Sequence, residues 1–76
     1  MKLIGIIGAM EVEVASLKEM MTDVTIRTKA SMEFNHGYLN GKEVVVVRSG
    51  IGKVNAGICT QILVDDYGVD CVINTG

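Results

Sequence analysis

Hydrophobic residues along the chain occur first as a short unbroken run and then at helical spacing. Residues 2–7 are mostly apolar and branched and end at Gly8, a pattern typical of a strand that is buried on both faces. From Met10 onward apolar residues recur every three or four positions, which predicts a helix over residues 10–21 with one face against a sheet. The chain is therefore predicted to begin with a strand and a helix.

The middle of the chain has the pattern of strands. Residues 24–30 and 34–39 alternate in part, and residues 43–49 contain four consecutive valines. Asn40-Gly41 separates the last two segments, and this dipeptide favours a two-residue hairpin because both turn positions need positive φ. We expect three strands here, the last two joined as a β-hairpin.

A second helix and a further strand follow. Apolar spacing predicts a helix over residues 53–67 with Gly68 as its C-cap. Residues 70–74 then have the composition of another buried strand. The order strand, helix, three strands, helix, strand predicts an α/β fold, a mixed sheet with flanking helices whose parallel core is formed by the strands that alternate with helices.

The carboxyl ends of the predicted strands are the expected place for chemistry, because open α/β sheets bind ligands there. Three such ends fall at residues 8–13, 49–52 and 74–76, and all carry glycine or small polar residues. The last apolar strand would leave a sheet edge uncovered. We therefore expect residues 1–76 to be the N-terminal portion of a single longer domain, truncated at its C-terminus.

Composition argues against several classes of protein. The net charge is −2 and the seven Lys and Arg residues are scattered, so nucleic-acid binding is not expected. The apolar runs are far shorter than the roughly 20 residues of a membrane-spanning helix. The N-terminus lacks the small-residue cleavage site of a secretory signal. A cytoplasmic protein with no membrane span is expected.

Several conspicuous residues have ordinary structural explanations. Cys59 and Cys71 form neither a zinc half-site nor a disulfide framework, so we predict reduced core thiols and no metal site. His36 has no acidic or cysteine partner within reach in the sequence and is assigned to the surface. Residues 49–53, Ser-Gly-Ile-Gly-Lys, lack the Walker A and dinucleotide-binding patterns, so a tight turn with a solvated Lys53 is favoured over phosphate binding.

Glu13 is the main candidate for chemistry, although an acid at this position also has a structural explanation. Together with Glu11 it lies in the first turn of the predicted helix, where the helix dipole stabilises negative charge by about 0.3–1 kcal/mol. The surrounding string decides in favour of chemistry. Residues 5–14, Gly-Ile-Ile-Gly-Ala-Met-Glu-Val-Glu-Val, resemble the opening of the 5′-methylthioadenosine/S-adenosylhomocysteine nucleosidases, in which a Gly-Ala-Met-Glu stretch precedes the catalytic glutamate.

The resemblance continues through residues 39–41, 49–56 and 72–76, so it covers essentially the whole chain in the right order. Val12 departs from it, because many relatives carry a third acid there. The resemblance places the chain in the purine nucleoside phosphorylase/uridine phosphorylase superfamily. It implies the N-terminal part of a nucleoside phosphorylase-like fold, and a homodimer that acts in methionine salvage without a metal or organic cofactor.

The reaction implied by the resemblance is hydrolysis of an N-ribosidic bond with release of adenine. Glu13 would orient and deprotonate the attacking water, and Ala9, Met10 and Ile51 would line the sugar and alkylthio side of the pocket. The general acid of the family, an aspartate far downstream, has no counterpart in these residues, so the 76 residues alone are expected to be inactive. A carboxylate at position 13 would repel phosphate by about 4 kcal/mol at a separation of roughly 4 Å and an effective dielectric near 20.

Other functions stay open at this point. A phosphate-dependent purine nucleoside phosphorylase, or a nucleosidase for another purine nucleoside, belongs to the same superfamily. A non-catalytic α/β fragment that binds a partner or a nucleotide is a third interpretation.

Overall fold

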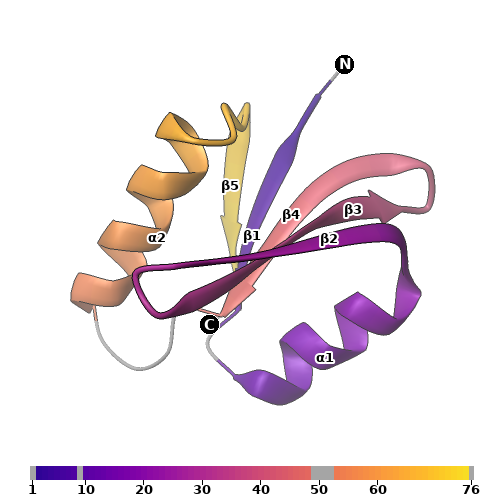
Figure 1. Cartoon of the computed structure of the whole chain (residues 1–76), viewed down its shortest axis with the longest axis horizontal. Coiled ribbons are helices and arrows are strands. Elements are labelled where there is room, and N and C mark those ends of the chain that lie inside the picture. Colours follow the sequence, from indigo (N-terminus) through magenta and orange to yellow (C-terminus); the bar gives the residue numbers. More distant parts are fainter. Residues whose placement is uncertain (1, 9, 49–52, 76) are drawn as a thin grey trace.

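The computed structural model describes residues 2–8, 10–48 and 53–75, and only the backbone of residues 53–56. Within these residues the predicted order of strands and helices is confirmed (Figure 1). The elements are β1 (Ile4–Gly8), α1 (Glu11–Met20), β2 (Met21–Lys29), β3 (Met32–Leu39), β4 (Lys42–Arg48), α2 (Lys53–Asp65) and β5 (Cys71–Asn74).

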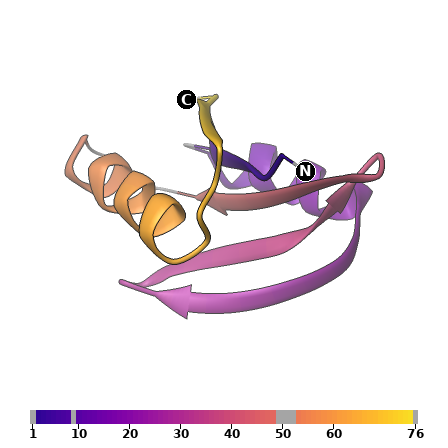
Figure 2. The same ribbon diagram turned by 90° about the horizontal axis from the view of Figure 1, so that it is seen from above.

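The strands form one mixed sheet in the order β2-β3-β4-β1-β5. β1 pairs in parallel with β4 and β5, whereas β3 pairs antiparallel with β2 and β4. The sheet is strongly twisted, and in Figures 1 and 2 the direction of β5 differs steeply from that of β2. The predicted α/β class with a parallel core is confirmed.

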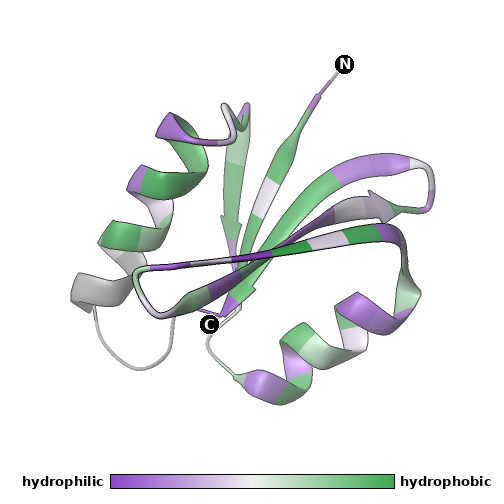
Figure 3. Cartoon of the chain, in the orientation of Figure 1, coloured by the Kyte–Doolittle hydropathy of each residue, from purple (hydrophilic) through white to green (hydrophobic). Residues whose placement is uncertain are grey.

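The two faces of the sheet bury separate hydrophobic clusters, one under each helix. Val44 and Val46 of β4 belong to the cluster that contains Val14 of α1. Val45 and Val47 belong to the cluster that contains Leu63 of α2. All four valines are at most 3% exposed, and burying each contributes roughly 1.5–3 kcal/mol. Figure 3 shows β1 and β4 as mainly hydrophobic, as expected for strands covered on both faces.

The hairpin of β2 and β3 reaches across to the end of α2. The ring of Phe34 stacks on that of Tyr67, with centroids 5.8 Å apart, and the guanidinium of Arg27 lies 5.8 Å from the centroid of the Tyr67 ring. An ion pair joins Lys29 to Asp66. These contacts connect the outer strands of the sheet to α2.

Two hairpin turns use residues with positive φ. The predicted turn at Asn40-Gly41 is confirmed, with φ values of 52° and 78°. A second turn, at Ala30-Ser31, has φ values of 53° and 64° and was not predicted, because alanine and serine are uncommon in this conformation. Lys29 and Met32, the residues that flank the turn, pair with each other, and this strand pairing holds the turn in place.

The boundary between α1 and β2 differs from the prediction. Residue 21 was expected to end the helix and the strand to begin at residue 24, but Met21 is already extended, with φ −86° and ψ 152°. Met21 pairs with Leu39 and is buried in the cluster beneath α1. Strand pairing and burial therefore end the helix at Met20, and no loop separates the two elements.

The C-terminal elements agree only in part with the prediction. Gly68 is confirmed as the C-cap of α2, with φ 64° and its N–H donating to the carbonyl of Val64 at 3.1 Å. β5 was predicted to be buried, but it pairs with β1 alone, and Ile73 is 48% exposed. The prediction of a buried strand is wrong within the described residues, because β5 is the edge of the sheet.

The two cysteines are free and differ in environment. Cys59 is fully buried, as predicted, and its Sγ donates to Sδ of Met32 at 2.9 Å. Burial raises the pKa of the Cys59 thiol, so the neutral form is favoured. Cys71, on the edge strand, is only partly buried.

In the described part of the chain, neither helix has the length and apolar character needed to cross a membrane.

Candidate functional site

The carboxyl ends of β1, β4 and β5 lie side by side, as the sequence predicts. The strand registers place Gly8 beside Arg48 and Ile7 beside Asn74. Thr75 continues this edge, and both its N–H and its Oγ1 hydroxyl donate to the carbonyl of Ile7, at 2.9 and 3.3 Å. The edge therefore presents glycine, a cation and a hydroxyl next to the start of α1.

The start of α1 brings Glu13 to this edge. Met10 is the N-cap, with φ −111° and ψ 141°, and its N–H donates to Oε1 of Glu13 at 3.3 Å. A glutamate three residues after the cap commonly reaches back in this way. The contact holds one carboxylate oxygen, and within the described residues the other oxygen has no hydrogen bond. A carboxylate whose second oxygen makes no hydrogen bond within the described residues is suited to bind and activate a water molecule.

Gly8 allows α1 to approach the end of β1 closely. A Cβ at this position would lie 2.8 Å from Cγ2 of Val14, 3.7 Å from Oγ1 of Thr75 and 3.9 Å from Cβ of Glu13. Val14 is β-branched and buried, so its side chain has little freedom to move away. Glycine is thus required by the packing of the helix that carries Glu13.

Gly8→Ala is expected to lower the free energy of unfolding by about 1–3 kcal/mol, the usual cost of adding a methyl group to a closely packed site. The measurement is chemical denaturation. Gly57→Ala is the matched control, since a Cβ there meets no atom of the described residues within 4 Å, and it should not lower the stability. Val14→Ala removes the clashing methyl groups, so the two substitutions together should cost less than the sum of their separate effects. Wild-type stability of Gly8→Ala would show that the close approach is unimportant.

A charged pair lies beside Glu13. Glu11, in the same first turn of α1, approaches Arg48 with an N–O distance of 3.8 Å. Both side chains are more than half exposed, so the pair contributes little stability. Its effect is electrostatic, because Glu11 offsets the positive charge that Arg48 brings to the strand ends.

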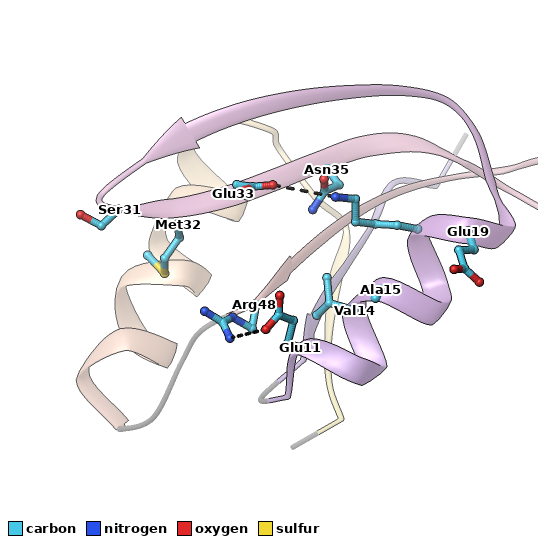
Figure 4. A pocket seen from close by; sticks show the side chains of 10 residues that line it. Glu11, Val14, Ala15, Glu19, Ser31, Met32, Glu33, Asn35 and Arg48 are labelled. Carbon is cyan, nitrogen blue, oxygen red and sulfur yellow. Dashed lines mark ion pairs between the residues drawn. The ribbon is translucent and has the colours of Figure 1, made fainter.

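A cavity of about 440 Å³ lies between α1 and the beginning of β3. Figure 4 shows its side chains coming from α1, from the start of β3 and from Arg48. Glu13 is not among the residues that line it. Glu11 and Arg48, which line the cavity, also lie at the strand ends, so the cavity adjoins the edge that carries Glu13.

The predicted site residues have different outcomes. Glu13 and Met10 come together through their hydrogen bond, and the Met10 side chain is 62% exposed. Ala9 and Ile51 lie outside the described residues, as does the predicted turn at residues 49–52. The side chain of Lys53 is also outside them. The pocket-lining roles of Ala9, Met10 and Ile51 stay predictions.

The assignment of His36 to a partnerless surface position is wrong. Its Nε2 lies 2.6 Å from Oε2 of Glu43, and its partly buried ring contacts the edge of Tyr67 at 5.7 Å between centroids. His36 pairs with Val45, so Glu43 is its diagonal neighbour on the same face of the hairpin. The Asn40-Gly41 turn fixes the register of β3 against β4. This turn is the sequence signal from which the His36–Glu43 contact could have been found.

Three further residues near the sites were not singled out by sequence. Arg48 and Thr75 become conspicuous only when the strand registers bring them to one edge. Asn35 lies in the middle of a strand and lines the cavity. Among the described residues, no cluster of three or more His, Cys, Asp or Glu could hold a metal ion.

Residues 3–76 match the Phosphorylase superfamily. The chain belongs to this superfamily. It is 59% identical over 73 residues to 5′-methylthioadenosine/S-adenosylhomocysteine nucleosidase of Shewanella loihica, an alignment that covers 96% of this chain and 32% of that protein. The chain thus spans about a third of the length of the curated Phosphorylase superfamily relatives that it matches.

Solved structures of the Phosphorylase superfamily share its fold. The 5′-methylthioadenosine/S-adenosylhomocysteine nucleosidase of Colwellia psychrerythraea, in complex with adenine, is 53% identical with a TM-score of 0.94, over 99% of this chain and 31% of that one. The corresponding enzyme of Neisseria meningitidis, in complex with methylthio-immucillin-A, is 43% identical with a TM-score of 0.93, over 100% of this chain and 33% of that one. The predicted nucleoside phosphorylase-like fold is confirmed.

Proposed function

We propose that the full-length gene product is a nucleosidase that hydrolyses the N-ribosidic bond of 5′-methylthioadenosine and S-adenosylhomocysteine and releases adenine. The observation that carries the proposal is Glu13, held by the Met10 N–H at the carboxyl edge of the sheet. High identity to nucleosidases of this substrate class supports it. Residues 1–76 would be the N-terminal portion of a single nucleosidase domain.

In this mechanism Glu13 is the general base. Cleavage of an N-ribosidic bond passes through an oxocarbenium-like state, which a water molecule on the face opposite the leaving base captures. One oxygen of Glu13 accepts from the Met10 N–H, and the other accepts a proton from that water. An acid on the opposite face must protonate the departing adenine, and residues outside this chain would supply it.

The remaining parts of the proposal concern substrate contacts and assembly. Ala9, Met10 and Ile51 would line the sugar and alkylthio side of the pocket. The exposed thioether chain of Met10, next to Glu13 in the chain, is suited to contact an alkylthio group. The gene product would act as a cytoplasmic homodimer in methionine salvage.

A phosphorylase is the alternative, and Arg48 is the observation that favours it. A guanidinium at the end of β4 is a suitable ligand for phosphate. Glu11 opposes this role at 3.8 Å, and Glu13 adds a second negative charge to the same turn. The Glu11 carboxylate beside the guanidinium, together with the negative charge of Glu13 in the same turn, favours neutral water over an anionic nucleophile.

The experiment that separates the two is adenine release from 5′-methylthioadenosine by the full-length gene product, with and without phosphate. We expect release at the same rate in both buffers, with free 5-methylthioribose as the second product. Formation of a ribosyl 1-phosphate only when phosphate is present would instead establish a phosphorylase. Absence of release in either buffer would contradict both.

A further inference from the structure

Thr75 carries a hydroxyl at the carboxyl edge of the sheet that strand pairing does not require. Its N–H already donates to the carbonyl of Ile7 at 2.9 Å, and the hydroxyl is a second donor to the same oxygen, at 3.3 Å. The usual range for an O–H donor ends near roughly 3.0 Å, so this second contact adds little to the pairing of β5 with β1. Strand pairing therefore does not account for a threonine at this position.

The Thr75 hydroxyl and Glu13 approach the same point from different elements. If Gly8 carried a Cβ, that atom would lie 3.7 Å from Oγ1 of Thr75 and 3.9 Å from Cβ of Glu13. Thr75 directly follows β5, whereas Glu13 lies in the first turn of α1. Neither residue is buried within the described part of the chain, so water can reach this part of the edge. The hydroxyl is thus a neighbour of the side chain that carries the carboxylate.

The two side chains present hydrogen-bond acceptors to a molecule bound between them. The Glu13 carboxylate only accepts, and its Oε1 takes the Met10 N–H, which leaves Oε2 for a ligand. The Thr75 hydroxyl gives its one hydrogen to Ile7, so it presents only lone pairs to a ligand. A molecule that satisfies both acceptors needs two donors. Water has two O–H bonds, whereas hydrogen phosphate has only one and is repelled by the carboxylate.

We propose that Thr75 is the second ligand of the attacking water, an inference that rests on the proposed nucleosidase function. One O–H of the water donates to Oε2 of Glu13 and the other to Oγ1 of Thr75, which leaves a lone pair of the water oxygen to face the substrate. As the bond between ribose and adenine breaks, its electron pair leaves with the base, which the acid outside this chain protonates. The water oxygen bonds to the anomeric carbon. Glu13 takes one proton, and the other hydrogen stays on the new ribose hydroxyl.

Thr75→Val tests this role because valine has a similar shape and lacks the hydroxyl. In the full-length gene product we expect kcat for adenine release from 5′-methylthioadenosine to fall roughly 3- to 10-fold, the value of one neutral hydrogen bond, with KM little changed. Thr75→Ser keeps a hydroxyl and should keep most of the wild-type rate. Thr28→Val is the matched control, since Thr28 is exposed on β2 at the opposite edge of the sheet, and it should leave the rate unchanged.

Competition between water and methanol gives a readout that a purely structural role of Thr75 would not change. Methanol has one O–H, so in the wild type it leaves one of the two acceptors unsatisfied and should react poorly. Thr75→Val removes one acceptor, so the ratio of methyl 5-methylthioriboside to free 5-methylthioribose should rise severalfold at a fixed methanol concentration. An unchanged ratio, or a wild-type kcat in Thr75→Val, would overturn the proposal. Absence of adenine release by the wild type would instead contradict the nucleosidase function, and this inference with it.

Discussion

Glu13→Gln is expected to lower the rate of adenine release by about 100- to 10,000-fold in the full-length gene product, the usual contribution of a positioned general base. Glutamine has the same size and still offers an oxygen to the Met10 N–H, so the start of α1 should keep its geometry. It cannot accept a proton from water. The effect should therefore appear in kcat, measured by steady-state kinetics, with little change in KM.

Glu11→Gln is the matched control for this substitution. Both glutamates lie in the first turn of α1, so removing either charge weakens the helix-dipole interaction by a similar amount, about 0.3–1 kcal/mol. Thermal unfolding of the two variants should be alike. Activity should differ, with a loss of at most severalfold for Glu11→Gln. Comparable large losses in both variants would mean that the turn needs negative charge and that Glu13 is not the base.

Phe34→Ala should lower the free energy of unfolding by about 3–5 kcal/mol, the usual cost of emptying a buried aromatic site. Phe34 has no exposed surface and belongs to the cluster beneath α2. Its ring also stacks on Tyr67, which joins β3 to the segment after α2. The substitution therefore removes core volume and one of the contacts that hold the outer hairpin against the helix.

The measurement for Phe34→Ala is the midpoint and slope of chemical denaturation. Tyr38→Ala, on the same strand, is the control because Tyr38 is 39% exposed, and its loss should cost less than about 1 kcal/mol. Equal destabilisation by the two substitutions would indicate that aromatic content of β3, and not burial under α2, sets the stability.

The sequence was sufficient to predict the class of fold because its local and long-range signals agree. The apolar run before Gly8 and the four valines of β4 are buried on both faces, as parallel strands require. The Asn40-Gly41 turn follows from residue type alone. The turn at Ala30-Ser31 does not, because its positive φ values are imposed by the pairing of the flanking strands.

Prediction of the site depended on a different kind of information. Nothing in the apolar pattern separates Glu13 from Glu11, and the family resemblance was needed to choose between them. The positions of Arg48 and Thr75 follow from the register of the strands, which a single sequence does not specify. The His36–Glu43 contact was within reach, since the predicted hairpin already places the two residues on one face.

The direct junction between α1 and β2 has a consequence for the position of Glu13. The helix is anchored at Gly8 by close packing and at Met21 by strand pairing, so its span is a fixed number of residues. One inserted residue would rotate the following helix by about 100° and would remove either Val14 from the core or Glu13 from the strand ends. The number of residues between Gly8 and Met21 therefore determines where the Glu13 carboxylate lies. Insertions and deletions are not tolerated in this segment, whereas the turns at residues 30–31 and 40–41 can accept them.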